Sequence, residues 1–114
     1  MRSLCVFAAL VVGVVGCKKS AASDPAEGRT LFENNCARCH GMEGKGGIPQ
    51  LAGGPAPRNL TEHAFQAERT DEQLRMTIVN GKGAGMPPFG QAFNEGQLAS
   101  LVAHVRSLDA EKKK

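Results

Sequence analysis

Two cysteines three positions apart, with a histidine directly after the second, constrain this chain more than any other feature. The run Cys36-Ala37-Arg38-Cys39-His40 has the C-x-x-C-H spacing of c-type haem attachment. Residues i and i+3 lie on one face of a helical turn, so two thiols so placed can add to the two vinyl groups on one side of a porphyrin. His40 then projects its imidazole toward the iron as the proximal ligand. We expect one covalent haem c, held by Cys36 and Cys39.

Three other uses of a C-x-x-C pair suit this chain less well. A thioredoxin-like redox pair needs a βαβ setting, and no β-branched strand pattern flanks Cys36 and Cys39. A tetrahedral zinc site needs a further ligand, which adjacent Cys39 and His40 without a second cysteine pair make awkward. A disulfide across two intervening residues would close too small a loop to stabilise much. Haem attachment is therefore the preferred interpretation.

The N-terminus has the pattern of an export signal. Arg2 supplies a positive charge, and an uncharged apolar run follows from residue 4 to residue 17. The run is shorter than the roughly 20 apolar residues that a membrane span needs, and it suits the h-region of a signal peptide. A buried core helix is the alternative, but the position behind Arg2 favours a signal. Cys5 lies inside the run and leaves with it.

The end of this apolar run indicates how the signal is removed. Residues 14–17, VVGC, resemble a bacterial lipobox, in which the cysteine is acylated and becomes the first mature residue. We therefore expect residues 1–16 to be a lipoprotein-type signal peptide, cleaved before Cys17, and Cys17 to carry lipid. The alternative is ordinary cleavage after Ala22 at an A-x-A-like site. That cut would leave two lysines between the apolar run and the cleavage point.

The rest of the chain divides into a tether at 17–23, a folded domain at 24–110 and a basic tail at 111–114. A domain this small buries only about 60% of its unfolded surface and commonly needs a disulfide, metal or cofactor, which agrees with haem. Lys and Arg number 14 against 11 Asp and Glu, a formal net charge of +3. That charge is too mild to suggest nucleic-acid binding.

The folded part has helix signals and no strand pairs. Asp24 reads as the N-cap of a helix into Cys36, with Glu27 as the reciprocal capping-box residue. Gly28 inside that helix predicts a close helix–helix contact. Further helices are expected from Thr61 to Ala67, from Thr70 to Asn80, and after Asn94. The last helix has an apolar face formed by residues at helical spacing: Leu98, Leu101, Val102, Val105 and Leu108.

A haem iron needs a second axial ligand or an open face, and Met or His suits an electron carrier. The candidates are Met42, Met76, Met86, His63 and His104. Met42 is too close to His40 to reach the opposite face, and Met76 reads as core filler. His63 suits a solvated surface position, and His104 suits packing between the terminal helices. Met86 lies in a Gly- and Pro-rich loop that permits close approach and limits motion. We expect Met86, with bis-His ligation as the alternative.

Four segments of the chain resemble a class I (monohaem) cytochrome c: CARCHG at 36–41, PQLAG at 49–53, GMPPFG at 85–90 and LVAHVRSL at 101–108. The resemblance covers nearly all of residues 26–108. It implies the all-α cytochrome c fold, with three to five short helices wrapped around one covalent haem, and it places the axial methionine at Met86. It also implies that the Pro49 carbonyl accepts a hydrogen bond from Nδ1 of His40. Arg58 and Asn59 are expected at the haem propionates, or else in solvent.

These features predict a single-electron carrier rather than an enzyme, since both axial positions are filled and no acid–base pair is evident. The expected partners are transient redox proteins and, through Cys17, a membrane; nucleic acids and small-molecule substrates are not expected, and the chain is expected to be a monomer. The location is the bacterial periplasm or cell envelope. The alternatives are a haem-based ligand-binding or sensor module, with Met86 displaceable, and the electron-entry subunit of a larger oxidoreductase.

Overall fold

The structure is a computed structural model that describes residues 21–114. Its elements, in chain order, are α1 (Pro25–Asn35), α2 (Ala37–His40), α3 (His63–Glu68), α4 (Asp71–Asn80), α5 (Glu95–Ser107) and a terminal 3-10 helix, η1 (Ala110–Lys113). Within residues 21–114 there is no strand, only an isolated bridge between Lys82 and Met86. The predicted all-α class is confirmed. No helix in this described part has the length and apolarity that crossing a bilayer requires.

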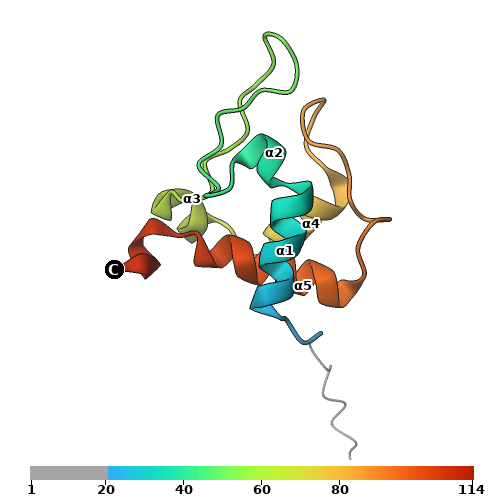
Figure 1. The fold of residues 1–114 in the computed structure, drawn as a ribbon, viewed down its shortest axis with the longest axis vertical. Coiled ribbons are helices and arrows are strands. Elements are labelled where there is room, and N and C mark those ends of the chain that lie inside the picture. The colour runs from blue at the N-terminus through green and yellow to red at the C-terminus, as the bar shows by residue number, and fades with distance from the viewer. Residues whose placement is uncertain (1–20) are drawn as a thin grey trace, which may run out of the picture.

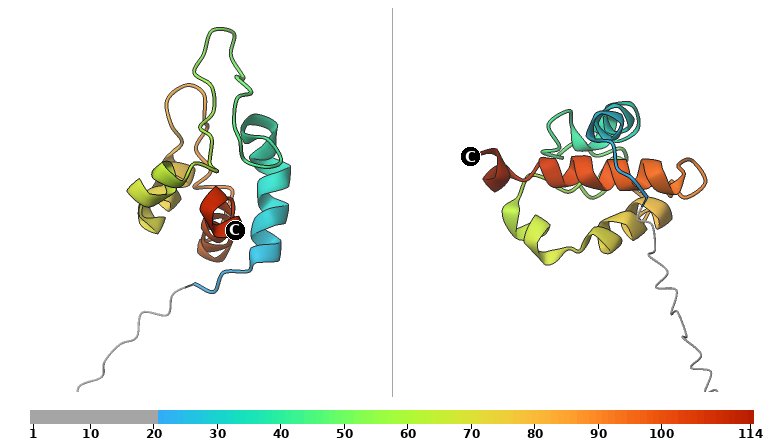
Figure 2. Two further views of the ribbon diagram at one scale, coloured as in Figure 1. Left: turned by 90° about the vertical axis from the view of Figure 1, so that its left-hand side faces the viewer. Right: turned by 90° about the horizontal axis from the view of Figure 1, so that it is seen from below.

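The domain is organised around α5. Viewed along α1, α5 runs across the molecule with α1 on one side and α3 and α4 on the other (Figure 2). The face of α5 predicted from helical spacing is buried as expected: Leu98, Leu101, Val102, Val105 and Leu108. Phe32 from α1, Leu74 and Ile78 from α4, and Ala37 and Leu60 complete the main core. Burial of this apolar surface is the main force that holds the helices together.

Helices α1 and α5 cross where Gly28 meets Ser100 (Figure 1). A Cβ atom on Gly28 would collide with the main-chain carbonyl of Ser100, so only glycine permits this approach. The close contact predicted for Gly28 is confirmed. The hydroxyl of Ser100 accepts a hydrogen bond from the Asp24 main-chain N–H at 2.9 Å and lies 3.2 Å from the Glu27 carboxylate. Ser100 therefore fixes the start of α1 on α5.

The helix caps agree with the sequence in three cases out of four. The Asp24 carboxylate accepts from the N–H groups of Ala26 and Glu27, although Glu27 turns to Ser100 and does not complete a capping box. Complete capping boxes begin α4 at Thr70 and α5 at Asn94. The predicted Thr61 cap is wrong. The Thr61 hydroxyl donates instead to Asn59 at 2.8 Å, and α3 begins two residues later without a side-chain cap.

Two long loops extend from the same end of the molecule as α2, and the chain enters at the opposite end (Figures 1 and 2). One loop joins α2 to α3, and the other joins α4 to α5. The first loop carries Pro49, Arg58 and Asn59, and the second carries Met86.

Three expectations from the sequence concern the signal peptide, the C-terminal tail and Met76. Residues 1–16, the predicted signal peptide, and Cys17 lie outside the described residues. Residues 111–113, expected in a tail, belong to η1. Met76 is 39% exposed, so the expectation that it fills the core is wrong. On α4 it lies between the buried residues Leu74 and Ile78, two positions from each, and therefore faces away from them.

Candidate haem site

Helix α2 is a single turn that brings the two cysteines and the histidine together. Cys36 both ends α1 and begins α2: its N–H donates to the Phe32 carbonyl at 2.8 Å, and its own carbonyl accepts from Cys39 and His40 at 3.1 and 2.9 Å. Cys36 and Cys39 are free thiols and half-buried. The i, i+3 spacing therefore lies on a real helical turn, as the attachment of two vinyl groups requires.

The surroundings of Cys36 favour a neutral thiol. Burial, and after it the neighbouring Cys39, raises the pKa of the Cys36 thiol to about 11. No group of three or more His, Cys, Asp or Glu side chains within residues 21–114 is placed to hold a metal ion. The site does not resemble a tetrahedral zinc centre.

The imidazole of His40 is oriented by a main-chain carbonyl. Its Nδ1 lies 3.0 Å from the carbonyl oxygen of Arg58. A carbonyl only accepts, so this contact requires the proton on Nδ1 and leaves the Nε2 lone pair for a metal. The prediction that Pro49 supplies this acceptor is wrong in this structure. Pro49 lies in the outer part of the loop between α2 and α3, and the returning segment brings Arg58 to the ring instead.

The path of this loop explains why Arg58 takes the role. The chain turns back directly after α2: the Gly46 N–H donates to the His40 carbonyl at 2.7 Å, and the Leu60 N–H donates to the Gly44 carbonyl at 2.7 Å. Gly46 has a φ of +73°, and a Cβ there would collide with the carbonyls of Pro57 and Arg58. Only glycine suits this position. The sequence shows a glycine cluster at this turn, but no local pattern shows which later residues of the loop pack against it.

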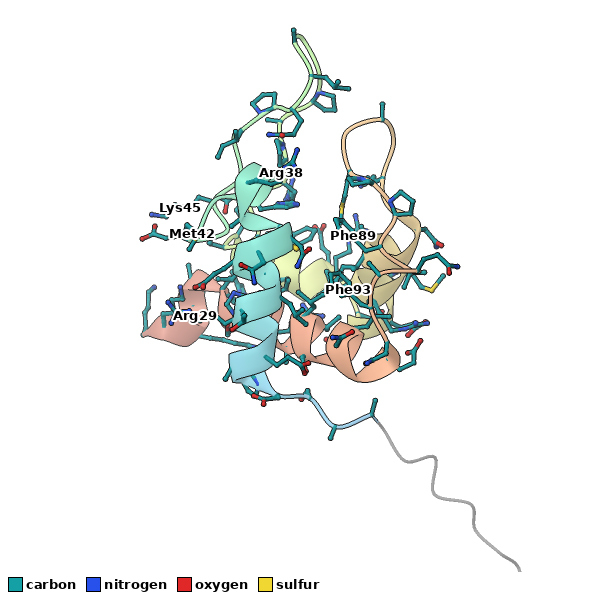
Figure 3. All side chains as sticks on the ribbon, turned by 45° about the vertical axis from the view of Figure 1, so that its right-hand side comes forward. Arg29, Arg38, Met42, Lys45, Phe89 and Phe93 are labelled. Atoms are coloured by element: carbon teal, nitrogen blue, oxygen red, sulfur yellow. The ribbon has the colours of Figure 1, made fainter. Side chains whose placement is uncertain are left out.

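Met86 lies in the loop between α4 and α5, which is fixed to α4. Its N–H and carbonyl pair with Lys82 at 3.2 and 2.9 Å, and the N–H of Phe89 donates to the Ile78 carbonyl at 2.9 Å. Met86 is half-buried against the core. Phe89 and Phe93 stack with ring centroids 5.7 Å apart, in the space between α1 and α4 (Figure 3). The sequence had not indicated Phe93.

The other candidates for the distal ligand occupy different places. Met42 is 63% exposed and lies beside Lys45 on the outer side of α2 (Figure 3). His104 packs its ring on Phe32 at a centroid distance of 4.9 Å, which confirms packing between the terminal helices. His63, expected to be solvated, is largely exposed but also contacts the buried carboxylate of Asp109.

The side chains of Arg58 and Asn59 have protein partners. Arg58 pairs with Glu62 at 2.8 Å, and its guanidinium carbon lies 5.0 Å from the centre of the Phe65 ring. The Asn59 side-chain oxygen accepts from both the N–H and the hydroxyl of Thr61, at 3.0 and 2.8 Å. The Arg58 side chain is also exposed, as the alternative of a position in solvent implies.

The residues present fit a haem. Two free thiols and a correctly protonated imidazole lie on one helical turn. A thioether lies in the facing loop on the apolar core. In the loop after α2, the apolar side chains of Ile48 and Leu51 are 47% and 50% exposed. Exposed apolar surface of this kind can mark the place where a partner or cofactor binds. Thiols, imidazole, thioether and apolar surface are the groups that hold a c-type haem.

Comparisons with known proteins agree with this site. The family model described as cytochrome c oxidase, cbb3-type, subunit III matches residues 23–105. The cbb3-type cytochrome c oxidase subunit CcoP of Rubrivivax gelatinosus is 36% identical over 96 residues, which are 79% of this chain and 29% of that protein. Cytochrome c-554(547) of Halothiobacillus neapolitanus is 33% identical over 90 residues, 76% of this chain and 99% of that protein.

Solved structures show the same likeness. The c-type cytochrome KustC0563 superposes with a TM-score of 0.63 at 28% identity, over 72% of this chain and 96% of that one. Cytochrome c6 of the diatom Phaeodactylum tricornutum gives a TM-score of 0.55 at 26% identity, over 81% of this chain and 100% of that one. The chain thus spans whole small proteins of this kind, but less than a third of the CcoP relative.

Proposed function

Because this chain belongs to the cytochrome c family, whose members carry covalent haem c, we propose that it is a single-electron carrier with one haem. Its fold is that of the solved c-type cytochromes it matches, as expected from the sequence. We assign the thioether bonds to Cys36 and Cys39 and the axial positions to His40 and Met86. The observation that supports this most strongly is the helical turn that unites both thiols with an imidazole whose Nδ1 is already hydrogen-bonded.

The bound haem supplies one-electron chemistry at its iron. The chain's own residues determine how that chemistry is used. The Arg58 carbonyl accepts from Nδ1 of His40, which would leave Nε2 free to hold the iron. Met86 would hold the iron from the loop between α4 and α5, and with both residues bound no place would be left there for a substrate. We therefore propose a carrier and no enzymatic role.

We propose a separate carrier rather than a fixed oxidase subunit. The support is the likeness to cytochrome c-554(547), which the chain matches at 33% identity over 99% of that protein. A separate carrier would meet its redox partners transiently, over a small interface, and act as a monomer. The second candidate function is electron entry into a larger oxidase, which the family model and the CcoP relatives favour.

We propose the bacterial cell envelope as the location, with the domain exported by residues 1–16 and held on a membrane by lipid on Cys17. The support is the sequence pattern alone, VVGC at 14–17 behind an apolar run. Attachment to a membrane would raise the concentration of the carrier near membrane-bound donors and acceptors.

The test is a comparison of carbon monoxide binding by the reduced holoprotein and by Met86→Ala. The carrier proposal expects a six-coordinate wild type that binds no carbon monoxide and titrates as one electron per chain. Met86→Ala opens the site, so it binds carbon monoxide, while Met42→Ala, a control at an exposed methionine, behaves as wild type. Rapid carbon monoxide binding by the wild type would support the sensor alternative and overturn the carrier proposal.

A further inference from the structure

We propose that Arg58 is the positioning residue for His40: its side-chain contacts with Glu62 and Phe65 hold its own carbonyl against Nδ1 and so set the donor strength of the axial imidazole. This inference rests on the proposed ligation of haem by His40. From the sequence, the Arg58 side chain was expected either at the haem propionates or in solvent. The inference gives this side chain a different role.

Arg58 contacts His40 through its main chain and α3 through its side chain. The main-chain carbonyl of Arg58 lies 3.0 Å from Nδ1 of His40. The guanidinium of the same residue lies 2.8 Å from the Glu62 carboxylate and 5.0 Å from the centre of the Phe65 ring. The two side-chain contacts restrain the guanidinium from two directions, an ion pair and a cation–π contact. The orientation of the Arg58 peptide is therefore coupled to α3.

Helix α3 is itself fixed to the core. The buried Gln66 side chain donates from its amide nitrogen to the Leu60 carbonyl at 2.7 Å and to the Val105 carbonyl at 2.9 Å. Arg106 on α5 donates to the main-chain and side-chain oxygens of Gln66 at 2.6 and 2.9 Å. A buried network with every group satisfied is rigid. The connection therefore runs from α5 through α3 and Arg58 to the imidazole.

The hydrogen bond to the Arg58 carbonyl changes how strongly His40 donates to a metal. A hydrogen bond from Nδ1 to a carbonyl draws electron density toward Nε2 and makes the imidazole a stronger ligand. A stronger donor favours the oxidised iron and lowers the reduction potential. The Arg58–Glu62 pair is solvent-exposed, so it adds little to stability. Its effect is expected in the properties of His40 rather than in the melting temperature.

The experiment uses the holoprotein and the double variant Arg58→Gln with Glu62→Gln. This exchange removes one positive and one negative charge, so the net charge near the haem stays constant. We expect a higher reduction potential and a several-fold faster exchange of the His40 Nδ1 proton with solvent, measured by NMR. Phe65→Leu removes the ring contact without a charge change and is expected to shift both quantities in the same direction.

The matched control is Arg29→Gln with Glu33→Gln, an ion pair of the same spacing and length, 2.8 Å, on α1. It is expected to leave the potential and the Nδ1 exchange unchanged. If the Arg58 and Phe65 variants match this control, Arg58 has no positioning role. If wild-type holoprotein shows no Nδ1 signal from an iron-bound His40, the proposed ligation fails, and this inference fails with it; the two failures are distinguishable because the first leaves the His40 signal in place.

Discussion

The imidazole of His63 lies 3.1 Å from the carboxylate of Asp109, and this contact joins the start of α3 to the residue that follows the last turn of α5. The neighbouring Ala110 N–H donates to the Thr61 carbonyl at 3.0 Å. The segment after α5 is thus attached to the segment before α3 at two points. The loop from α2 that supplies Arg58 ends at this junction.

Asp109 makes the stability of the domain depend on acid. Burial tends to raise the pKa of its carboxyl, but hydrogen bonds from His63 and from the Glu111 N–H outweigh this and hold the pKa below its ordinary value. The carboxylate therefore stabilises the fold fully above about pH 4, the ordinary aspartate pKa, and this stabilisation disappears as the pH falls through the lower folded pKa. Urea unfolding of Asp109→Asn should show lower stability at neutral pH and a weaker loss in acid. Equal acid dependence in Asp109→Asn and in the exposed control Glu111→Gln would contradict this role.

Gly28→Ala should destabilise the crossing of α1 and α5 by about 1–3 kcal/mol, because the new methyl group meets the Ser100 main chain. Helix propensity alone predicts the opposite, a gain of about 1 kcal/mol. Gly96→Ala, in the first turn of α5, is the control: its Cβ would lie 3.3 Å from Oδ1 of Asn94 and 4.0 Å from the Ala22 carbonyl oxygen, with no main-chain collision. Urea unfolding of the two variants decides the matter. If Gly28→Ala is as stable as Gly96→Ala, the helices can move apart at residue 28 with no loss in the free energy of unfolding, and the prediction is wrong.

His104 should make the domain less stable at mildly acidic pH. Burial lowers the pKa of His104, and the Arg29 guanidinium lowers it further; its Nε2 is buried without a hydrogen-bond partner. The unfolded chain therefore binds a proton more readily, so stability falls as the pH drops below about 6.5. His104→Phe keeps the contact with Phe32 and removes the titration. Its melting temperature should change less than that of wild type between about pH 7.5 and pH 5.5; an identical change in both proteins would contradict the prediction.

Cys17 can be tested apart from the fold. If Cys17 carries lipid, Cys17→Ala should move the protein from the membrane fraction to the soluble fraction of cells that export it. Cys5→Ala, within the predicted signal peptide, is the matched control and should leave the protein on membranes. Release by neither substitution, or by both, would favour cleavage after Ala22 or another mode of attachment.

Local patterns in the sequence were enough to predict most of the helices. The helix starts at Thr70 and Asn94 and the apolar face of α5 depend on residues three or four positions apart, and all three are confirmed. The position of Met76 was wrong because a methionine fits either side of a helix, and only the packing of α4 on α5 decides which side is covered. Hydrophobicity alone does not fix a face.

The acceptor for His40 could not be found in the same way. The choice between Pro49 and Arg58 depends on how a long loop returns, and that path is set by turns at Gly44 and Gly46 and by pairing across the loop. Such contacts join residues far apart in the sequence and leave no periodic signal. The motif at residues 36–40, in contrast, carries its chemistry in a single turn, so the sequence was sufficient to place both thiols and the imidazole on it.

The central claim is that Cys36 and Cys39 hold a haem through covalent bonds, and the most direct measurement is haem staining on a denaturing gel. The protein is expressed together with a cytochrome c maturation system, and wild type is compared with Cys36→Ala, Cys39→Ala and the double variant. Wild type should keep its haem stain at the size of the chain after denaturation and after acid-acetone extraction, and the double variant should lose it. A wild-type band that stays colourless, or a double variant that stains equally, would contradict the account.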